Sequence, residues 1–286
     1  MRSKLFVPAI RPELFEKALH SGADAVCFDL EDAVAPNRKS EAREFLHTFL
    51  SQHSPTAAPL LLVRTNAVAS ADFPQDITCA LWPSLYAIAL PKVESAEEVY
   101  VAAARIAEFE TSRNLPSQVG ILPTIESPRG LRFAAEIALS SPRVIGLQLG
   151  FADLLEPLDI ATDNVSVRNQ IRLMLRLAAA EGGVDCYDSA YASLKDLAGY
   201  ESQLKAARSL GFSGSSCIHP TQVSVANLVF TPTDEELAHA RRIVEAAEQA
   251  AQEGSAVTTL DGKMIDAPFI LRAHQLLAHK LSQTED

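Results

Sequence analysis

Acidic and basic side chains follow several apolar segments of this 286-residue sequence, where each segment ends. Glu126 and Asp153 close two consecutive segments and could share one divalent cation. Oxygen-only ligation suits Mg²⁺, which takes one or two carboxylates together with water and substrate oxygens. Zinc is disfavoured because no His or Cys clusters with this pair. Arg64 closes an earlier segment and could grip a substrate carboxylate through its guanidinium fork. A surface or interface ion pair is the alternative for Arg64.

The apolar segments that carry these residues must position them. They run without apolar/polar alternation, which is typical of parallel strands covered on both faces. The predicted strands are 5–8, 25–30, 60–64, 87–91, 119–125, 144–150, 184–187 and 216–219.

Helical patterns separate these predicted strands, at 12–20, 96–110, 167–181, 200–210 and 233–253. Strands alternating with helices predict an α/β protein, a (β/α)8 TIM barrel. In such a barrel the active site lies at the carboxyl ends of the strands, where the polar residues gather. A doubly wound sheet is the alternative, but the Gly-x-Gly-x-x-Gly fingerprint of dinucleotide-binding sheets is absent.

The sequence predicts a barrel domain over 1–253 and a C-terminal helical arm over 254–286. The arm begins with a turn-rich stretch around Asp261-Gly262-Lys263, and a short helix is expected from Pro268.

Composition narrows the possible partners. The chain has 25 Lys+Arg and 36 Asp+Glu, a net charge of −11, which argues against nucleic acid as a partner. An anionic small molecule in a local basic pocket is still possible. No apolar run reaches the roughly 20 residues that cross a bilayer, and we expect no export signal. The four scattered cysteines predict reduced, buried thiols and a cytoplasmic protein.

Nine short motifs, in this order, make the sequence recognisable. They are RSKLFVP at 2–8, GADAV at 22–26, DLEDAVAP at 29–36, VRTN at 63–66, LPKVES at 90–95, IESPRG at 125–130, GFADL at 150–154, CIHPTQ at 217–222 and DGKMID at 261–266. The chain thereby resembles the citrate lyase β-subunit-like proteins of the HpcH/HpaI aldolase/citrate lyase superfamily.

The resemblance implies a TIM barrel that assembles as a homotrimer or hexamer. It also implies a Mg²⁺-dependent carbon–carbon lyase (an oxo-acid-lyase) that cleaves a 3-hydroxyacyl-CoA into an acyl-CoA and a keto acid by retro-Claisen chemistry. Malyl-CoA, citramalyl-CoA and citryl-CoA are the candidate substrate types. Two alternatives stay open: the citryl-cleaving β subunit of a multi-subunit citrate lyase, whose substrate is carried by a protein, and a non-catalytic metabolite-binding barrel.

The resemblance also implies roles for individual residues. Glu126 and Asp153 correspond to metal ligands, Glu126 also lying at the substrate, and Arg64 to the contact with the substrate carboxylate and carbonyl. The other residues it implicates are Glu31 and Asp32 around the metal-bound water, Phe6, Arg11 and Lys17 at coenzyme A, and Asp266 as an acid/base that reaches into a neighbouring subunit's site.

Four further positions carry expectations of their own. Lys92 and Glu94 are expected to form a structural pair at the barrel mouth, and His219 to orient the last loop. Ala9 stands where relatives commonly carry Gly, which would restrict a positive φ beside the coenzyme A site.

Overall fold

The structure, a computed structural model, describes residues 1–54, 58–116 and 118–284. The chain forms two compact units, Met1–Phe230 and Thr231–Asp286. The sequence analysis divides the chain at residue 253 instead. The difference concerns helix α11 (Asp234–Gln252), which belongs by its contacts to the C-terminal unit.

The first unit is built on eight parallel strands that close into a barrel in chain order. Closure is made by β1, in which Lys4 lies between Ala25 of β2 and Ser216 of β8. The strands are β1 (Ser3–Pro8), β2 (Ala25–Asp29), β3 (Leu60–Arg64), β4 (Leu85–Leu90), β5 (Gly120–Ile125), β6 (Gly146–Leu149), β7 (Asp185–Asp188) and β8 (Gly214–Cys217). The predicted (β/α)8 barrel is confirmed, although its last strand ends two residues before His219.

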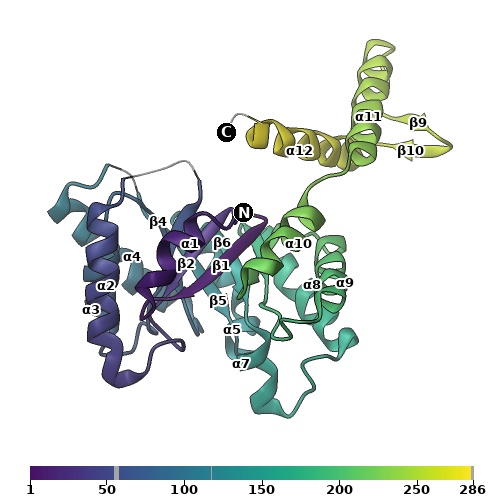
Figure 1. Ribbon diagram of the computed structural model, residues 1–286. Coiled ribbons are helices and arrows are strands. Elements are labelled where there is room, and N and C mark those ends of the chain that lie inside the picture. The colour runs from purple at the N-terminus through teal and green to yellow at the C-terminus, as the bar shows by residue number, and fades with distance from the viewer. Residues whose placement is uncertain (55–57, 117, 285–286) are drawn as a thin grey trace. The chain divides into compact units, whose positions relative to one another are not determined.

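Helices surround the strands of this unit, as Figure 1 shows. They are α1 (Phe15–Leu19), α2 (Lys39–Gln52), α3 (Phe73–Ala80), α4 (Ala96–Arg113), α5 (Pro128–Arg132), α6 (Ala134–Leu139), α7 (Phe151–Leu155), α8 (Val165–Glu181), α9 (Leu197–Ser209) and α10 (Pro220–Phe230). The sequence sets clear ends for some of them. Helix α4 begins at a capping box between Ser95 and Glu98, and it ends at Asn114 in the left-handed conformation.

The core of the first unit has two layers. The larger layer fills the space between strands and helices, for example with Leu46, Ile88 and Ile106. The smaller layer fills the barrel interior with mostly small side chains: Ala25, Cys27, Leu62, Ala87, Ala89, Leu122 and Tyr187.

The charged residues at the strand ends continue the series of side chains that face the barrel interior. Successive side chains in a strand point to opposite faces, so every second residue faces the interior. Cys27, Leu62 and Leu122 face inward. Two residues further along lie Asp29 and Arg64, and Glu126 lies four residues beyond Leu122. The alternation along the strands therefore directs these charged groups to the interior side, and the parallel strands place them at the same end of the barrel.

The C-terminal unit consists of α11, the strands β9 (Thr258–Leu260) and β10 (Lys263–Ile265), and α12 (Ala267–Thr284). The two strands form a hairpin around Asp261 and Gly262, both with positive φ, as a two-residue hairpin turn requires. The unit has an apolar cluster of its own, centred on Ala240, Ile243, Ile265 and Ala273. Helix α12 is much longer than the short helix expected from Pro268.

None of the helices in the described parts of the chain is long and apolar enough to cross a bilayer.

Candidate active site at the carboxyl ends of the strands

Arg64, at the end of β3, is held in one orientation by Asp29 at the end of β2. Its Nε donates to Oδ1 of Asp29 at 2.8 Å, and its Nη2 donates to Oδ2 at 2.7 Å. Nη1 lies 2.9 Å from Oε2 of Glu31, and the guanidinium is 5.1 Å from the centre of the Phe6 ring. Arg64 is therefore in an ion pair, but with a buried carboxylate and not at the surface as the alternative interpretation supposed. The same contacts orient its fork within the barrel mouth.

Glu31 lies between two cations. Its carboxylate is buried and receives a hydrogen bond from Nζ of Lys92 at 2.8 Å, in addition to its contact with Arg64. The neighbouring Asp32 is exposed, 3.5 Å from Nζ of Lys92. Burial raises the pKa of Glu31, and the two cations oppose this shift. Glu31 and Asp32 thus lie in the same charged cluster as Arg64, as their predicted placement requires.

Lys92 does not pair with Glu94, contrary to the expectation from the sequence. Lys92 reaches across the mouth to Glu31, whereas Glu94 accepts a hydrogen bond from the hydroxyl of Ser127 at 2.6 Å. Ser127 also caps helix α5 by accepting from the main chain of Gly130. Glu94 therefore serves the start of α5, and Lys92 belongs to the charged cluster.

Glu126, directly after β5, is buried and tightly surrounded. The main-chain N–H of Lys92 donates to its Oε1 at 2.6 Å. A β-carbon added at Gly150 would lie 2.5 Å from its Oε2. Burial raises the pKa of Glu126 to about 7, the Lys92 N–H opposes this shift, and the charges of Glu31 and Asp153 add to it. Asp153, in the first turn of α7, is thus close enough for its charge to act on Glu126.

The charge of this cluster fits a divalent cation. In the described part of the mouth, five carboxyl groups face three basic groups, an excess of two negative charges when all are ionised. They are Asp29, Glu31, Asp32, Glu126 and Asp153 against Lys4, Arg64 and Lys92.

The donor set also agrees with the kind of ion expected from the sequence. Among the described residues, no group of three or more His, Cys, Asp or Glu side chains could hold a metal. Glu126 and Asp153 offer two carboxylates only. This matches Mg²⁺, which keeps several waters or substrate oxygens, and it does not match a closed zinc site. A cation here would also relieve the repulsion that raises the pKa of Glu126.

A second layer of buried polar residues supports the mouth. Nζ of Lys39 donates to the carbonyls of Leu30 and Glu31 at 2.7 and 2.8 Å, and to the side chain of Asn66 at 2.7 Å. Asn66 in turn donates to Asp76 of α3. The DLEDAVAP and VRTN motifs contain or adjoin these residues, but sequence reasoning assigned them no role.

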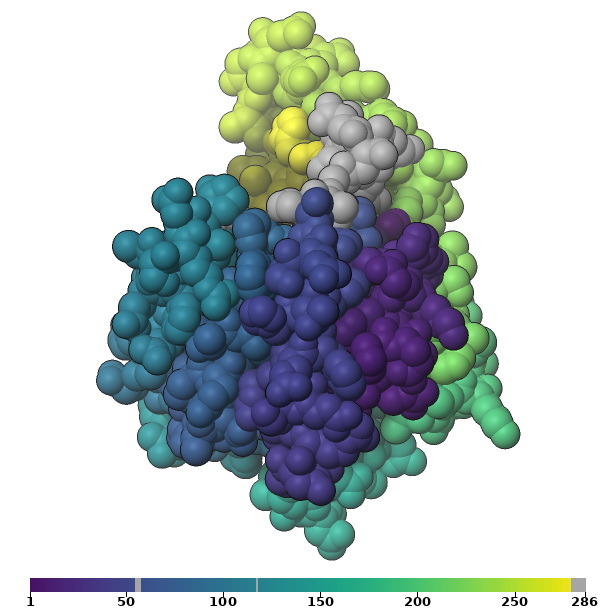
Figure 2. Space-filling model, turned by 60° about the vertical axis from the view of Figure 1, so that its left-hand side comes forward, coloured from purple at the N-terminus to yellow at the C-terminus, as the bar shows by residue number. Residues whose placement is uncertain are grey.

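The residues implicated in coenzyme A binding lie on the β1–α1 segment. Phe6 is partly buried under Arg64, within β1. Arg11 is exposed and paired with Glu13, and Lys17 is exposed on α1. Figure 2 shows this N-terminal segment, in purple, at the surface of the first unit. Ala9 is buried and is not among the residues with positive φ, so the change from Gly imposes no backbone strain here.

Asp266 lies in the C-terminal unit, directly before α12. Its main-chain carbonyl accepts from Phe269 and Ile270 in the first turn of that helix. The Oδ1 atom of its carboxylate is buried and has no hydrogen-bond partner. His219 is exposed and contacts Thr221 at the start of α10, which agrees with the structural role expected for it.

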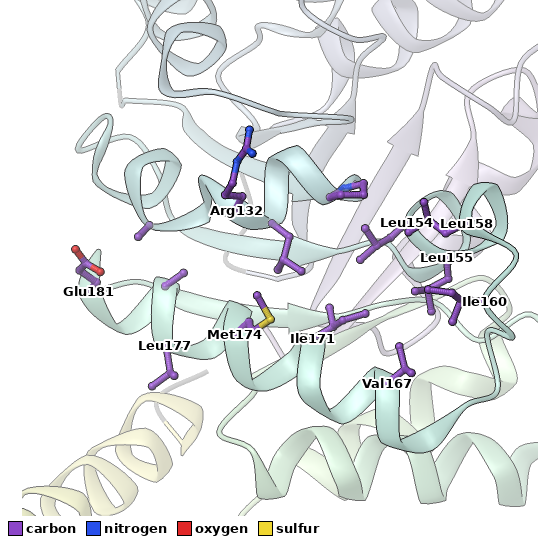
Figure 3. A pocket seen from close by; sticks show the side chains of 14 residues that line it. Arg132, Leu154, Leu155, Leu158, Ile160, Val167, Ile171, Met174, Leu177 and Glu181 are labelled. Carbon is purple, nitrogen blue, oxygen red and sulfur yellow. The ribbon is translucent and has the colours of Figure 1, made fainter.

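A groove lies between helices on the outside of the first unit. It has a volume of about 600 Å³ and runs between the α5–α6 segment, α7 and α8. Figure 3 shows that its walls are mainly aliphatic, with Met174 and Ile171 in the middle and Arg132 and Glu181 on one side. Neither Arg64 nor Glu126 lines it, so it is a surface feature and not the reaction site.

The closed barrel, with charged side chains gathered at the carboxyl ends of its strands, defines the chain as an enzyme of the (β/α)8-barrel class. The profile of the HpcH/HpaI aldolase/citrate lyase family matches residues 2–220. The chain therefore belongs to the HpcH/HpaI aldolase/citrate lyase family.

Individual relatives match over nearly the whole chain. Citrate lyase subunit beta of Escherichia coli (strain K12) is 35% identical over 281 residues, covering 97% of this chain and 92% of that protein. L-malyl-CoA/beta-methylmalyl-CoA lyase of Rhodobacter capsulatus is 31% identical over 297 residues, covering 96% and 93%. The crystal structure of protein CitE from Mycobacterium tuberculosis, in complex with magnesium, acetoacetate and coenzyme A, has a TM-score of 0.75 at 29% identity, covering 97% and 98%.

Proposed function

We propose that this chain is a Mg²⁺-dependent carbon–carbon lyase that cleaves a 3-hydroxyacyl-CoA into an acyl-CoA and a keto acid. The observation that carries the proposal is the meeting of Arg64, oriented by Asp29, with the carboxylates of Glu126 and Asp153 at one end of the barrel. The lyases and the magnesium and coenzyme A complex among the relatives support the same reaction class.

The reaction is a retro-Claisen cleavage of the bond between C2 and C3 of the acyl chain. The 3-hydroxyl group transfers its proton to a basic group of the site and becomes the carbonyl of the keto acid. The electron pair of the broken bond moves to C2 and forms the thioester enolate. A proton delivered to C2 then completes the acyl-CoA, so no oxidant and no water is consumed.

Glu126 and Asp153 are the residues that hold the metal in this proposal. A bound Mg²⁺ supplies Lewis-acid stabilisation of negative charge on the substrate oxygens. Arg64 binds the substrate carboxylate through Nη1, the end of its guanidinium group that Asp29 does not occupy, and offsets charge that develops on the carbonyl oxygen. Glu31 and Asp32, bonded to Lys92, face the same space and orient water around the metal.

Asp266 is the residue that protonates the enolate. Its Oδ1 is buried and has no hydrogen-bond partner in the described part of the chain, so its capacity to bond is unused there. In our proposal the chain assembles as a trimer or hexamer, and the C-terminal arm of residues 254–286 supplies Asp266 to the site of a neighbouring subunit. The apolar groove over α7 and α8, with exposed Met174 and Leu177, supports an assembly of several subunits.

Coenzyme A lies over the β1–α1 segment in this proposal. Arg11 and Lys17 are exposed cations that can reach its phosphates, and Phe6 offers a partly buried ring. The four cysteines are free and buried, which supports a reducing, cytoplasmic location.

A second candidate function is the citryl-cleaving subunit of a multi-subunit citrate lyase. The 35% identity with the Escherichia coli subunit favours it over the metabolite-binding alternative, which has no use for an acid/base. Its substrate would be a protein-bound thioester, not free coenzyme A.

A panel of free thioesters tests the proposal. Malyl-CoA, citramalyl-CoA and citryl-CoA are each incubated with the protein and Mg²⁺, and acyl-CoA and keto acid are both quantified. We expect equal amounts of the two products from at least one thioester. Cleavage of carrier-bound citryl thioester alone would favour the second candidate, and release of free coenzyme A without keto acid would contradict the lyase.

A further inference from the structure

We propose that Lys92 is a positioning residue of this site with two separable roles: its main-chain N–H orients Glu126, and its ammonium group holds Glu31 beside Arg64. The proposal rests on the proposed function and adds a residue for which the sequence indicated only a structural pair with Glu94.

The backbone of Lys92 is unusual for its residue type. Four non-glycine residues in the described chain have a positive φ, and three of them are Asn or Asp, which tolerate the left-handed conformation. Lys92 is the fourth, with φ of 53°. This conformation places its N–H on Oε1 of Glu126 at 2.6 Å. Strain that persists at a functional site is expected where the surrounding contacts impose it.

The two carboxylate oxygens of Glu126 have different surroundings. Oε1 accepts a hydrogen bond from the Lys92 N–H, and Oε2 lies against Gly150. Gly150 precedes Asp153 by three residues in the sequence. The carboxylate therefore has one oxygen anchored to the main chain of Lys92 and the other packed against Gly150.

The side chain of Lys92 performs the second role. Its ammonium group lies 2.8 Å from Oε1 of Glu31 and 3.5 Å from Asp32. Glu31 is buried, and its other contact is with Arg64 at 2.9 Å. Without Lys92, Glu31 would keep a single cationic partner while its charge still acts on Glu126. The Glu31 carboxylate would then displace the Arg64 guanidinium group or shift toward a metal bound by Glu126 and Asp153.

Three variants separate these roles. Lys92→Met removes the ammonium group but keeps the side-chain length and the main-chain N–H. Lys92→Arg keeps the charge. Lys92→Gly removes the ammonium group and also the backbone strain, because glycine adopts a positive φ freely. The matched control is Lys205→Met, which removes an exposed lysine on α9 that pairs with Glu201.

Four quantities are measured for each variant: the Kd for Mg²⁺ by calorimetry without substrate, the Tm in chelator, kcat and KM. For Lys92→Met we expect kcat to fall about tenfold or more, with KM changed less than about threefold. Its Mg²⁺ affinity should be retained or higher, because the site becomes more negative. Lys92→Arg should recover most of kcat. Lys92→Gly should melt higher than Lys92→Met, because the strain is removed. It should bind Mg²⁺ more weakly, because the freer glycine backbone fixes the N–H on Oε1 of Glu126 less firmly.

Other results overturn the proposal. Wild-type kcat in Lys92→Met would reject the role of the ammonium group, and equal Mg²⁺ affinity in Lys92→Gly and Lys92→Met would reject the role of the main chain. If Tm, Mg²⁺ affinity and kcat fell together in both Lys92→Met and Lys92→Arg, Lys92 would have only a structural role. If the wild type cleaves no thioester, the proposed function fails, but the Mg²⁺ titrations and melting temperatures still decide the main-chain role.

Discussion

Arg64 and Asp29 form a two-point ion pair across the ends of neighbouring strands, with distances of 2.8 and 2.7 Å. Asp29 also accepts a hydrogen bond from the main-chain N–H of Glu31 at 2.9 Å. The guanidinium plane is therefore fixed by the strand that precedes Glu31. This leaves one end of the fork, Nη1, in the charged mouth of the barrel.

Arg64→Lys should separate geometry from charge. The variant keeps one positive charge but replaces the fork by a point charge, which cannot make both bonds to Asp29. We expect kcat/KM to fall about 100-fold, the size of effect seen when one oriented donor to a developing charge is lost. Calorimetry should find Mg²⁺ binding preserved. A variant with wild-type kcat/KM would contradict the role of Arg64.

Gly150→Ala should displace Glu126 without disturbing the backbone conformation. Gly150 has φ of −123°, which any residue adopts, so its role is one of space. The added β-carbon would lie 2.5 Å from Oε2 and 2.8 Å from Cβ of Glu126. We expect the Kd for Mg²⁺ to rise about tenfold or more, because a ligand misplaced by a fraction of an ångström is a poor ligand.

Gly183→Ala is a useful comparison for this variant. Gly183 has φ of 66° and nothing near the position of an added β-carbon, so the substitution strains the backbone without crowding Glu126. It should lower Tm and leave Mg²⁺ binding unchanged. If Gly150→Ala behaved in the same way, the contact with Glu126 would have no bearing on the metal.

Lys4 should make the stability of the protein depend on pH in the alkaline range. Lys4 is fully buried inside the barrel, and burial lowers its pKa from 10.5 to about 8. Below pH 8 the lysine is charged in both folded and unfolded chains, so the folded state bears the full cost of burying the charge. Between pH 8 and 10.5 the unfolded chain binds more protons, so stability rises with pH.

Lys4→Met isolates this effect. The difference in free energy of unfolding between wild type and variant should shift by about 3 kcal/mol in favour of the wild type from pH 8 to 10.5. Urea unfolding in chelator at a series of pH values measures it. Parallel stability curves for the two proteins would show that Lys4 titrates normally.

Asp266 can be tested by mixing subunits. Asp266→Asn should lower kcat far more than it raises KM, because the residue acts in proton transfer. Glu126→Gln should be inactive through loss of the metal. If Asp266 serves a neighbouring subunit, refolding the two inactive variants together should produce assemblies in which some sites are intact, and activity should return. No recovery from assemblies shown to contain both variants would place Asp266 in the site of its own chain.

The sequence predicted the architecture well because the barrel depends on repeated, local patterns. Continuous apolar segments marked all eight strands within a few residues. Since carboxyl ends of parallel strands meet at one rim, the sequence also indicated that Arg64, Glu126 and Asp153 lie together. No helix was predicted at six places where the structure has one, namely α2, α3, α5, α6, α7 and α10.

The contacts within the site were less predictable. The reach of Lys92 to Glu31 joins residues 61 positions apart. A local pair with Glu94 was the simpler expectation. A positive φ at a lysine has no signature in residue type, whereas the turn at Asp261-Gly262 does. The space requirement at Gly150 likewise depends on a carboxylate from another strand.

The most direct test of the account is the metal dependence of cleavage at Glu126 and Asp153. Wild type, Glu126→Gln and Asp153→Asn are freed of metal with chelator, checked for unchanged circular dichroism, and assayed with the best thioester as Mg²⁺ is added back. We predict no turnover without metal, full recovery of the wild type on addition of Mg²⁺, and no recovery of either variant. Cleavage by the metal-free wild type, or Mg²⁺-dependent cleavage at the wild-type rate by either variant, would contradict the central claim.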